Sequence, residues 1–403
     1  MEKKSYYILS PTLTFEKSDD SVIITDFITG KSQRVSRQIF NVLQNFNKNS
    51  SLSYISAYLK KDNSALVGIE SLIDFLISNE ILIESHEEPT LKLLNPTHKI
   101  LNSSFIKIKK LNEGNIVFVG VPLSKGNQTN IGVEEFPDTI RRFFNITAHI
   151  SNSKSINAVK HIHHLFSNKN LSLLYDKELL FDIGNIYFHP SEEKLLSYSK
   201  IHNTIKKIAE KNSIPFIFGG DHSISFPSIK AVAEEKSGIQ VLHFDAHFDY
   251  NNSQINRLYE KNNHIILNHG NFINEVVKLN NVSKIYQFGV RQFINTGYNE
   301  KITTFFQNEM IDNKQILGIC NETPCYVSID IDFFDPSYAI ATSTPMINGL
   351  SYNDSLTFVH DVLKDKNIAA IDLVEVNPNL DIRNQTMQFT RNLIFFVLSL
   401  IRL

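Results

Sequence analysis

The segment Gln240-Val-Leu-His-Phe-Asp-Ala-His-Phe-Asp249 joins a short apolar run to three evenly spaced polar side chains. The apolar run has the length and composition of a strand that is buried on both faces of a parallel sheet. Asp245, His247 and Asp249 lie two residues apart, so on an extended chain they project to one side. Uncompensated charges at a strand end are costly, and a divalent cation would compensate them. The segment therefore predicts an α/β domain with a metal site at one edge of its sheet.

Similar apolar runs alternate with helical patterns from Phe105 to the end of the chain. They occupy residues 115–119, 214–218, 240–244, 284–288, 326–330 and 368–373. Polar residues follow their C-terminal ends, which is where open α/β sheets place their active sites. We expect the run at 393–401, too short to span a bilayer, to be the last buried helix.

Two further motifs follow such strands. Asp330 and Asp332 have the same two-residue spacing, and His222 lies in Gly219-Gly-Asp-His-Ser223. Each motif alone is more often a turn or a solvated strand end, but their joint occurrence favours a metal site. Four carboxylates and two imidazoles suit manganese or another borderline divalent ion better than zinc. The ligands are too many for one ion that keeps a water, and they fit two ions about 3.5–4 Å apart.

These motifs resemble the signatures of the arginase/agmatinase ureohydrolases. The resemblance covers about residues 110–403 and includes, in the expected order, Gly120-Val-Pro, Asp182-Ile-Gly-Asn, Gly289-Val-Arg and Asp372-Leu-Val-Glu-Val-Asn-Pro378. It implies a three-layer α-β-α arginase-like fold with a central, mostly parallel sheet over residues 104–403. It also implies a hydrolase that acts on C–N bonds of linear amidines and releases urea.

The resemblance further implies two Mn²⁺ ions per subunit, with Asp245 and Asp330 bridging them. The ligands of one ion would be His222, Asp245, Asp249 and Asp330. Those of the other would be His247, Asp245, Asp330 and Asp332.

Two more residues match functional positions of the family. Glu375 corresponds to a glutamate that binds the guanidinium group through charge-assisted hydrogen bonds. His269 resembles a loop histidine that passes a proton to the leaving amine, with His264 as a nearby competitor. Both are expected to contact the substrate, and together with Asp249 they form the predicted catalytic group.

The substrate end departs from the family pattern. The segment between Asp249 and His269 is longer than usual, and Ala341-Thr-Ser-Thr-Pro-Met346 stands where the family has Gly-Thr-Gly-Thr-Pro-Glu. The metal chemistry is retained while recognition of the far end of the substrate is altered, which disfavours free arginine or agmatine.

Residues 1–85 form a different pattern, and residues 86–103 are typical of a linker. We expect a strand at 21–27, a turn at 29–30, helices at 35–46, from Ser51 to 59 and at 66–76, and a short strand at 81–83. This is a winged helix-turn-helix order. Nine Lys/Arg against ten Asp/Glu give a net charge of −1, so the domain lacks the basic face of a DNA reader, and no nucleic-acid partner is expected.

The same region resembles the leader-peptide-binding domain of ribosomal peptide biosynthesis, similar to the pyrroloquinoline-quinone chaperone. That resemblance implies that a leader adds as an extra strand at a sheet edge, against the third helix. The two halves together predict a peptide arginase that holds a precursor peptide by its leader and converts arginine side chains to ornithine.

Three alternatives stay open. The chain could be a free small-molecule ureohydrolase (arginase, agmatinase or formiminoglutamase-like) with an accessory domain, or residues 1–85 could be a structural or oligomerisation appendage. The third, a regulatory binding protein without activity, is disfavoured by the intact ligand set. The net charge of −2, two isolated cysteines and an N-terminus unlike a signal peptide predict a cytoplasmic protein without a membrane partner. The family's trimers and hexamers suggest a homo-oligomer.

Overall fold

The computed structural model divides the chain into two compact units, residues 1–92 with 187–200 and residues 93–186 with 201–403. The described residues are 6–10, 13–26, 31–46, 50–51, 69–79, 81–85, 93–101, 103–126, 131–147, 163–189, 192, 194–250, 260–261, 264–265, 267–293, 299–310 and 316–402.

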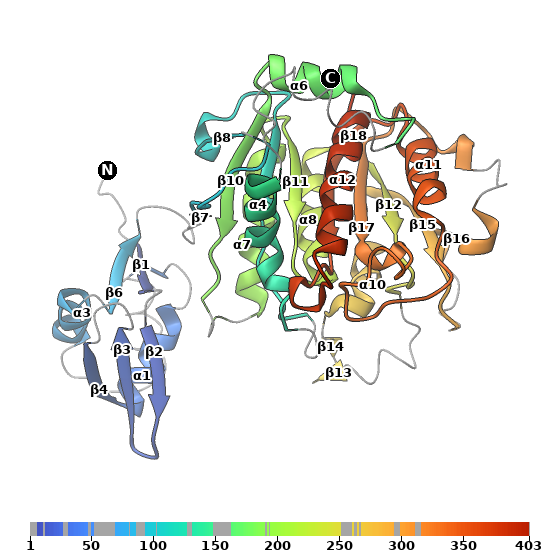
Figure 1. The fold of residues 1–403 in the computed structure, drawn as a ribbon. Helices are drawn as coiled ribbons and strands as arrows, with labels where there is room; N and C mark the ends of the chain where they lie inside the picture. Colours follow the sequence, from blue (N-terminus) through green and yellow to red (C-terminus); the bar gives the residue numbers. More distant parts are fainter. Residues whose placement is uncertain are drawn as a thin grey trace. The chain divides into compact units, whose positions relative to one another are not determined.

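The first unit contains two small antiparallel sheets, drawn in blue in Figure 1. One has the order β5-β1-β6, from β1 (Tyr6–Leu9), β5 (Ser50–Ser51) and β6 (Leu82–Ser85). The other has the order β2-β3-β4, from β2 (Leu13–Lys17), β3 (Ser21–Asp26) and β4 (Ser32–Ser36). The helices are α1 (Arg37–Leu43), which continues into η1 (Gln44–Phe46), and α3 (Ile69–Ser78). Apolar side chains from both sheets and both helices share one core.

Helix α1 starts two residues after Val35, which the sequence had placed on that helix. This prediction was wrong, because Val35 belongs to β4 and fills the core from the sheet side. The strand continues to Ser36, whose side chain then accepts a hydrogen bond from the Ile39 N–H at 3.3 Å and caps the helix. Strands β1, β2, β4 and β5 were not predicted, whereas β3 and β6 were. The predicted turn at 29–30 and the helix after Ser51 lie outside the described residues, so the winged helix-turn-helix order stays a prediction.

The second unit is built on one sheet, in which ten strands are described (Figure 1). Its order is β16-β15-β12-β17-β18-β11-β9-β10-β7, with β8 also paired to β10. Their bounds are β7 (Leu93–Leu94), β8 (Ser104–Phe105), β9 (Ile116–Gly120), β10 (Leu180–Ile186), β11 (Ile214–Phe218), β12 (Ile239–Phe244), β15 (Val282–Val290), β16 (Ile302–Phe306), β17 (Cys325–Asp330) and β18 (Ile368–Val374). All neighbours pair in parallel except β7, which runs antiparallel to β10. The predicted α/β fold with a mostly parallel sheet is therefore confirmed. A separate pair is formed by β13 (Glu260–Lys261) and β14 (His264–Ile265).

Helices cover both faces of this sheet (Figure 1). Ile116 and Phe118 of β9 pack into the main apolar core, whereas Val117 points the other way and is equally buried. The core contains α4 (Phe136–Thr147), α6 (Asn168–Asp176), α11 (Tyr352–Leu363) and α12 (Gln385–Leu400). The remaining helices are α7 (Lys194–Ala209), of which residues 201–209 belong to this unit, α8 (Ser225–Glu235), which contacts β17 and β18, and the short α10 (Ile273–Val276). The expected final helix is present as α12 and is largely buried. Within the described residues, no helix combines the length and the apolar character needed to cross a membrane.

Four central strands bring their C-terminal ends level. Phe244 of β12 aligns with Ile329 of β17, and Asp330 of β17 aligns with Val374 of β18. On the other side of β18, Leu373 aligns with Phe218 of β11. Because parallel strands end at one edge, the residues that follow them are brought together there.

Candidate metal centre

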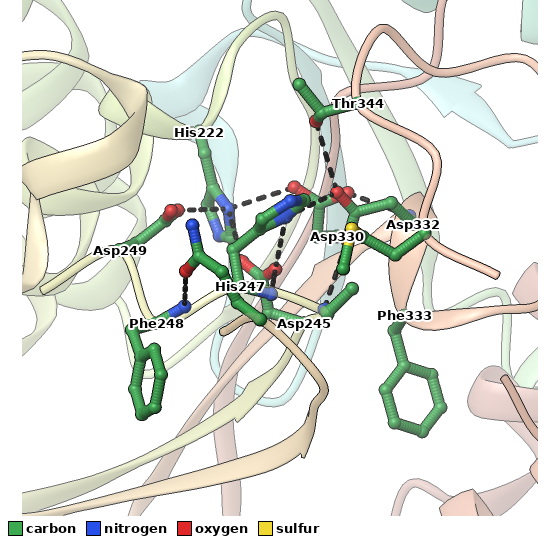
Figure 2. A network of polar contacts seen from close by, with 12 residues as sticks. His222, Asp245, His247, Phe248, Asp249, Asp330, Asp332, Phe333 and Thr344 are labelled. Carbon is green, nitrogen blue, oxygen red and sulfur yellow. Dashed lines mark hydrogen bonds and ion pairs between the residues drawn. The ribbon is translucent and has the colours of Figure 1, made fainter. Parts of the chain in front are cut away.

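Each of the six predicted ligands lies at or just after the end of one of these strands. Asp245, His247 and Asp249 follow β12, and His222 opens η4 (His222–Ile224) shortly after β11. Asp330 ends β17, and Asp332 lies in η9 (Ile331–Phe333) directly after it. Figure 2 shows these side chains pointing toward one another.

His222 is the centre of one group of carboxylates. Its Nδ1 lies 3.2 Å from Asp245 Oδ2, 3.1 Å from Asp249 Oδ2 and 3.1 Å from Asp330 Oδ2. All four residues are buried or nearly so. A single nitrogen therefore faces three carboxylate oxygens that would repel one another without a cation.

His247 is the centre of the second group. Its Nδ1 lies 2.9 Å from Asp332 Oδ2 and 3.4 Å from Asp245 Oδ1. Asp245 thus presents one oxygen to each histidine, as a carboxylate shared between two cations would.

Backbone N–H groups fix one oxygen of each of three carboxylates. Asp245 Oδ1 accepts from His247 N at 2.6 Å, and Asp330 Oδ1 accepts from Asp332 N at 2.8 Å. Asp332 Oδ1 accepts from Ala246 N at 3.1 Å. The Oδ2 atom of each residue is thereby held toward a histidine. The Thr344 hydroxyl also donates to Asp332 Oδ2 at 3.4 Å (Figure 2).

The electrostatics of the cluster favour the binding of cations. Burial and the neighbouring carboxylates of Asp332 and Asp245 raise the pKa of Asp330 well above its ordinary value. Burial would lower the pKa of His222, but its contacts with Asp245, Asp249 and Asp330 raise that pKa well above the ordinary value. His222 Nδ1 and Asp245 Oδ2 are buried and have no hydrogen-bond partner among the described residues. Divalent cations among these atoms would satisfy both the charge and the unpaired groups, so the residues fit a binuclear metal centre.

A hydrogen-bonded chain behind His222 leaves Nδ1 available to a metal. The Ser328 hydroxyl donates to Asp372 Oδ1 at 2.7 Å, and the same hydroxyl oxygen lies 2.9 Å from His222 Nε2. Since the hydroxyl proton points to Asp372, Nε2 carries the imidazole proton and donates it. Tyr326 donates to Asp372 Oδ2 at 2.6 Å and holds that carboxylate in place. Ser328 and Asp372 stood in quoted motifs, but their orienting role depends on adjacent strands and was missed.

Glu375 and His269 meet beside the metal centre. Glu375 follows β18 with a positive φ of 60°, and its Oε1 accepts a hydrogen bond from the His222 backbone N–H at 2.8 Å. Nδ1 of His269, the first residue of η6 (His269–Asn271), lies 3.7 Å from the same Oε1. Burial, followed by the charge of Asp221, raises the pKa of Glu375 to about 8. A cationic substrate group beside Glu375 would favour its ionised form.

Glycine is required where the loop after β11 approaches the loop after β9. A Cβ on Gly220 would come 1.8 Å from the Leu123 carbonyl oxygen, to which Asp221 N donates at 2.9 Å. The Asp221 carboxylate in turn accepts from Gly126 N at 2.7 Å and Ser223 N at 2.9 Å. These bonds fix the turn that presents His222.

Part of the predicted substrate end lies outside the described residues. That is so for residues 251–259, 262–263 and 266 of the long segment before His269. His264, the competitor of His269, belongs to β14. The altered stretch 341–346 is described, and Thr344 is its member that contacts a candidate ligand.

Comparisons with known proteins agree with this geometry. A family model described as "Arginase family" matches residues 114–399. The mitochondrial agmatinase of Gallus gallus is 28% identical over 303 residues, which cover 70% of this chain and 80% of the relative. The formimidoylglutamase of Bacillus subtilis (strain 168) is 26% identical over 309 residues, which cover 70% of this chain and 85% of the relative. Among solved structures, proclavaminate amidino hydrolase from Streptomyces clavuligerus has the same fold, with a TM-score of 0.60 and 20% identity over 76% of this chain and 97% of that one.

Proposed function

Because this chain belongs to the arginase family of hydrolases that act on C–N bonds of linear amidines, we propose that it hydrolyses arginine side chains within a ribosomal precursor peptide. The reaction adds water to the guanidinium carbon and breaks its bond to the side-chain nitrogen, leaving ornithine and releasing urea. The observation that carries the chemistry is the pair of histidine–carboxylate groups that share Asp245 beside Glu375.

We assign two Mn²⁺ ions to this centre. His222, Asp245, Asp249 and Asp330 would hold one, and His247, Asp245, Asp330 and Asp332 would hold the other. When bound, the ions lower the pKa of water enough for attack near neutral pH.

The chain's own residues position the substrate and move the proton. Glu375 is buried with one carboxylate oxygen on the His222 N–H, and it would receive the planar guanidinium. His269 lies 3.7 Å away from that carboxylate with a partly exposed ring, and would transfer a proton to the leaving amine.

Exposed apolar side chains beyond the sheet edge support a peptide substrate. Ile131, Phe293 and Ile347 are 80%, 101% and 81% exposed, and each lies on a loop past the C-terminal end of a parallel strand. Two of these loops are anchored to the site: Asn377 Nδ2 donates to Ile131 O at 3.1 Å, and Arg291 Nε donates to Ile347 O at 3.1 Å. Free arginine and agmatine offer only a short methylene chain to such a rim, whereas the residues that flank an arginine in a peptide can place whole apolar side chains on it.

The first unit supports leader capture. Strand β4 ends its three-stranded sheet, and Gln33 Nε2 of β4 donates to Asn79 Oδ1, just after α3, at 2.9 Å. Phe75 of α3 is 41% exposed, one turn before Asn79. A leader added along β4 would find this apolar side chain nearby. Tethering by the leader raises the local concentration of the core peptide, so single arginines need only weak contacts.

The alternative is a ureohydrolase of a free small molecule, as the names of the agmatinase and formimidoylglutamase relatives suggest. The test is to incubate the manganese-loaded chain with an arginine-containing precursor peptide, free arginine, agmatine and formimidoylglutamate. We expect urea release from the peptide, with loss of CH₂N₂ from each modified arginine by mass spectrometry. Fast turnover of a free compound with none of the peptide would establish the alternative.

A further inference from the structure

A second set of buried polar side chains lies next to Asp245. It is separate from the hydrogen-bonded chain of Ser328 and Asp372 next to His222. His243 is fully buried on β12, and its Nε2 lies 3.0 Å from Asp245 Oδ2, although the two atoms are not aligned for a hydrogen bond. Its Nδ1 lies 3.2 Å from Gln287 Nε2 on the neighbouring strand β15. Neither residue has a role among the predicted site residues, although both are fully buried polar groups in the centre of the sheet.

The orientation of the Gln287 amide follows from its other partners. Gln287 Nε2 donates to the carbonyl oxygen of Phe248, which can only accept a hydrogen bond. Gln287 Oε1 accepts from the Thr304 hydroxyl at 3.0 Å. The amide nitrogen, and not the oxygen, therefore faces His243 Nδ1.

This orientation fixes the tautomer of His243. Because Gln287 donates to Nδ1, that nitrogen is an acceptor and the proton of the neutral ring sits on Nε2. Nε2 also lies close to His222, Asp245 and Asp249, so position alone would allow it to be a metal ligand. A protonated nitrogen cannot bind a metal, but its N–H group can stabilise the charge of a nearby carboxylate.

We infer that His243 is a positioning residue whose Nε2–H faces the Oδ2 oxygen of Asp245, the carboxylate shared by the two metal sites, and stabilises its negative charge. The inference rests on the proposed metal centre and concerns a residue that is not a ligand. Gln287 extends the effect, because the Phe248 carbonyl it binds lies between His247 and Asp249 in the chain. One glutamine thus ties β15 to the ligand-bearing loop and sets the proton of His243.

Two substitutions of His243 distinguish the effect of its N–H donor from the effect of its aromatic ring. His243→Phe keeps an aromatic ring that can pack on Phe272, whose centroid lies 5.6 Å from that of His243, but it has no N–H. His243→Gln lacks the ring but supplies an N–H donor. A matched control is His163→Phe, which alters another buried histidine, packed against Phe396 of α12.

Manganese binding is measured by calorimetry and by the electron paramagnetic resonance spectrum of the coupled Mn²⁺ pair. The melting temperature of each metal-free protein reports folding. We expect His243→Phe to bind two ions about ten- to a hundredfold more weakly, with an altered pair spectrum. His243→Gln should recover most of the affinity, and His163→Phe should match the parent protein.

Three results would overturn the inference. The first is that His243→Phe binds manganese as tightly as the parent does. The second is that both His243 variants retain only one ion. The third is that both variants weaken manganese binding equally while their melting temperatures stay unchanged. If His243→Phe fails to fold, Gln287→Met removes the donor to Nδ1 without changing the ring. Weaker manganese binding by Gln287→Met supports the inference, and parental binding contradicts it. A parent protein that binds no manganese would contradict the proposed metal centre instead, so the two failures are distinguishable.

Discussion

Nδ1 of His269 lies 3.7 Å from Oε1 of Glu375, although one residue precedes α10 and the other follows β18. The two side chains therefore face one space beside the metal centre. Their proposed roles differ, because one binds the guanidinium and the other supplies a proton, and kinetics can separate them.

Glu375→Gln should weaken substrate binding while leaving the metal centre loaded. The amide oxygen can still accept the His222 N–H, but the negative charge opposite the guanidinium is lost. Loss of a charge-assisted hydrogen bond of about 1.5–3 kcal/mol predicts a fall in kcat/KM of about ten- to a hundredfold. Steady-state urea release and metal analysis check this, with exposed Glu113→Gln as the control. Unchanged kinetics for Glu375→Gln would remove Glu375 from the substrate site.

His269→Asn should lower kcat more than it changes KM. The asparagine cannot transfer a proton at neutral pH, and general acid catalysis contributes about 10²–10⁴-fold to rates. Single-turnover kinetics on the peptide would show the slowed step, and bound manganese should stay at two ions. If the variant is as fast as the parent, another residue supplies the proton, and His264→Asn is the next variant to measure.

Asp245→Asn and Asp332→Asn should differ in how many ions they retain. Asp245 contacts both histidine groups, whereas Asp332 contacts His247 alone. We expect Asp245→Asn to lose both ions and all measurable activity, and Asp332→Asn to keep the ion near His222. Elemental analysis after dialysis gives the counts. Full activity in Asp245→Asn would refute the catalytic assignment.

Ile347→Ser should slow hydrolysis of a peptide without affecting metal content. Burying an exposed aliphatic side chain against a ligand is worth about 1.5–3 kcal/mol, so kcat/KM for the peptide should fall about ten- to a hundredfold. The comparison substrate is a blocked single arginine with no apolar neighbours, for which the variant and parent should be equal. An equal loss on both substrates would show that the rim acts on the site and not on the peptide.

Phe75→Asp should weaken leader binding and leave the hydrolase unit intact. The exposed ring next to the β4 edge is replaced by a charge that an apolar leader side chain would avoid. Fluorescence anisotropy of a labelled leader should show at least a tenfold weaker complex, from loss of about 1.5–3 kcal/mol of apolar burial. Glu16→Ala, exposed on β2 at the opposite end of the sheet, is the control. Equal leader binding by parent and Phe75→Asp would exclude this surface.

The sequence predicted those parts of the fold that local pattern determines. The strand that ends at Phe244 is a short apolar run, and the ligands that follow it are spaced two residues apart. On an extended backbone this spacing makes their side chains project to the same side. Strand β10 was not predicted, since Asp182 interrupts its apolar pattern. That carboxylate is tolerated because Arg141 of α4 forms two hydrogen bonds with it, at 2.8 and 2.9 Å, in the core.

What the sequence could not give was the set of contacts made between strands. His243 stands two residues before Asp245, yet its tautomer depends on Gln287 of another strand. Similarly, Val35 continues a helical spacing, but pairing with Val22 in the sheet keeps it extended. In each case a partner distant in sequence decides the outcome.

The backbone N–H of His222 holds Glu375 while the ring of the same residue faces the carboxylates of the metal centre. Cation loading and the proposed guanidinium binding should therefore be energetically coupled through one residue. Such coupling is reciprocal: if bound cations increase the affinity for the substrate by some factor, bound substrate increases the affinity for the cations by the same factor. The enzyme should hold its cations most firmly while it is occupied and exchange them most readily between turnovers.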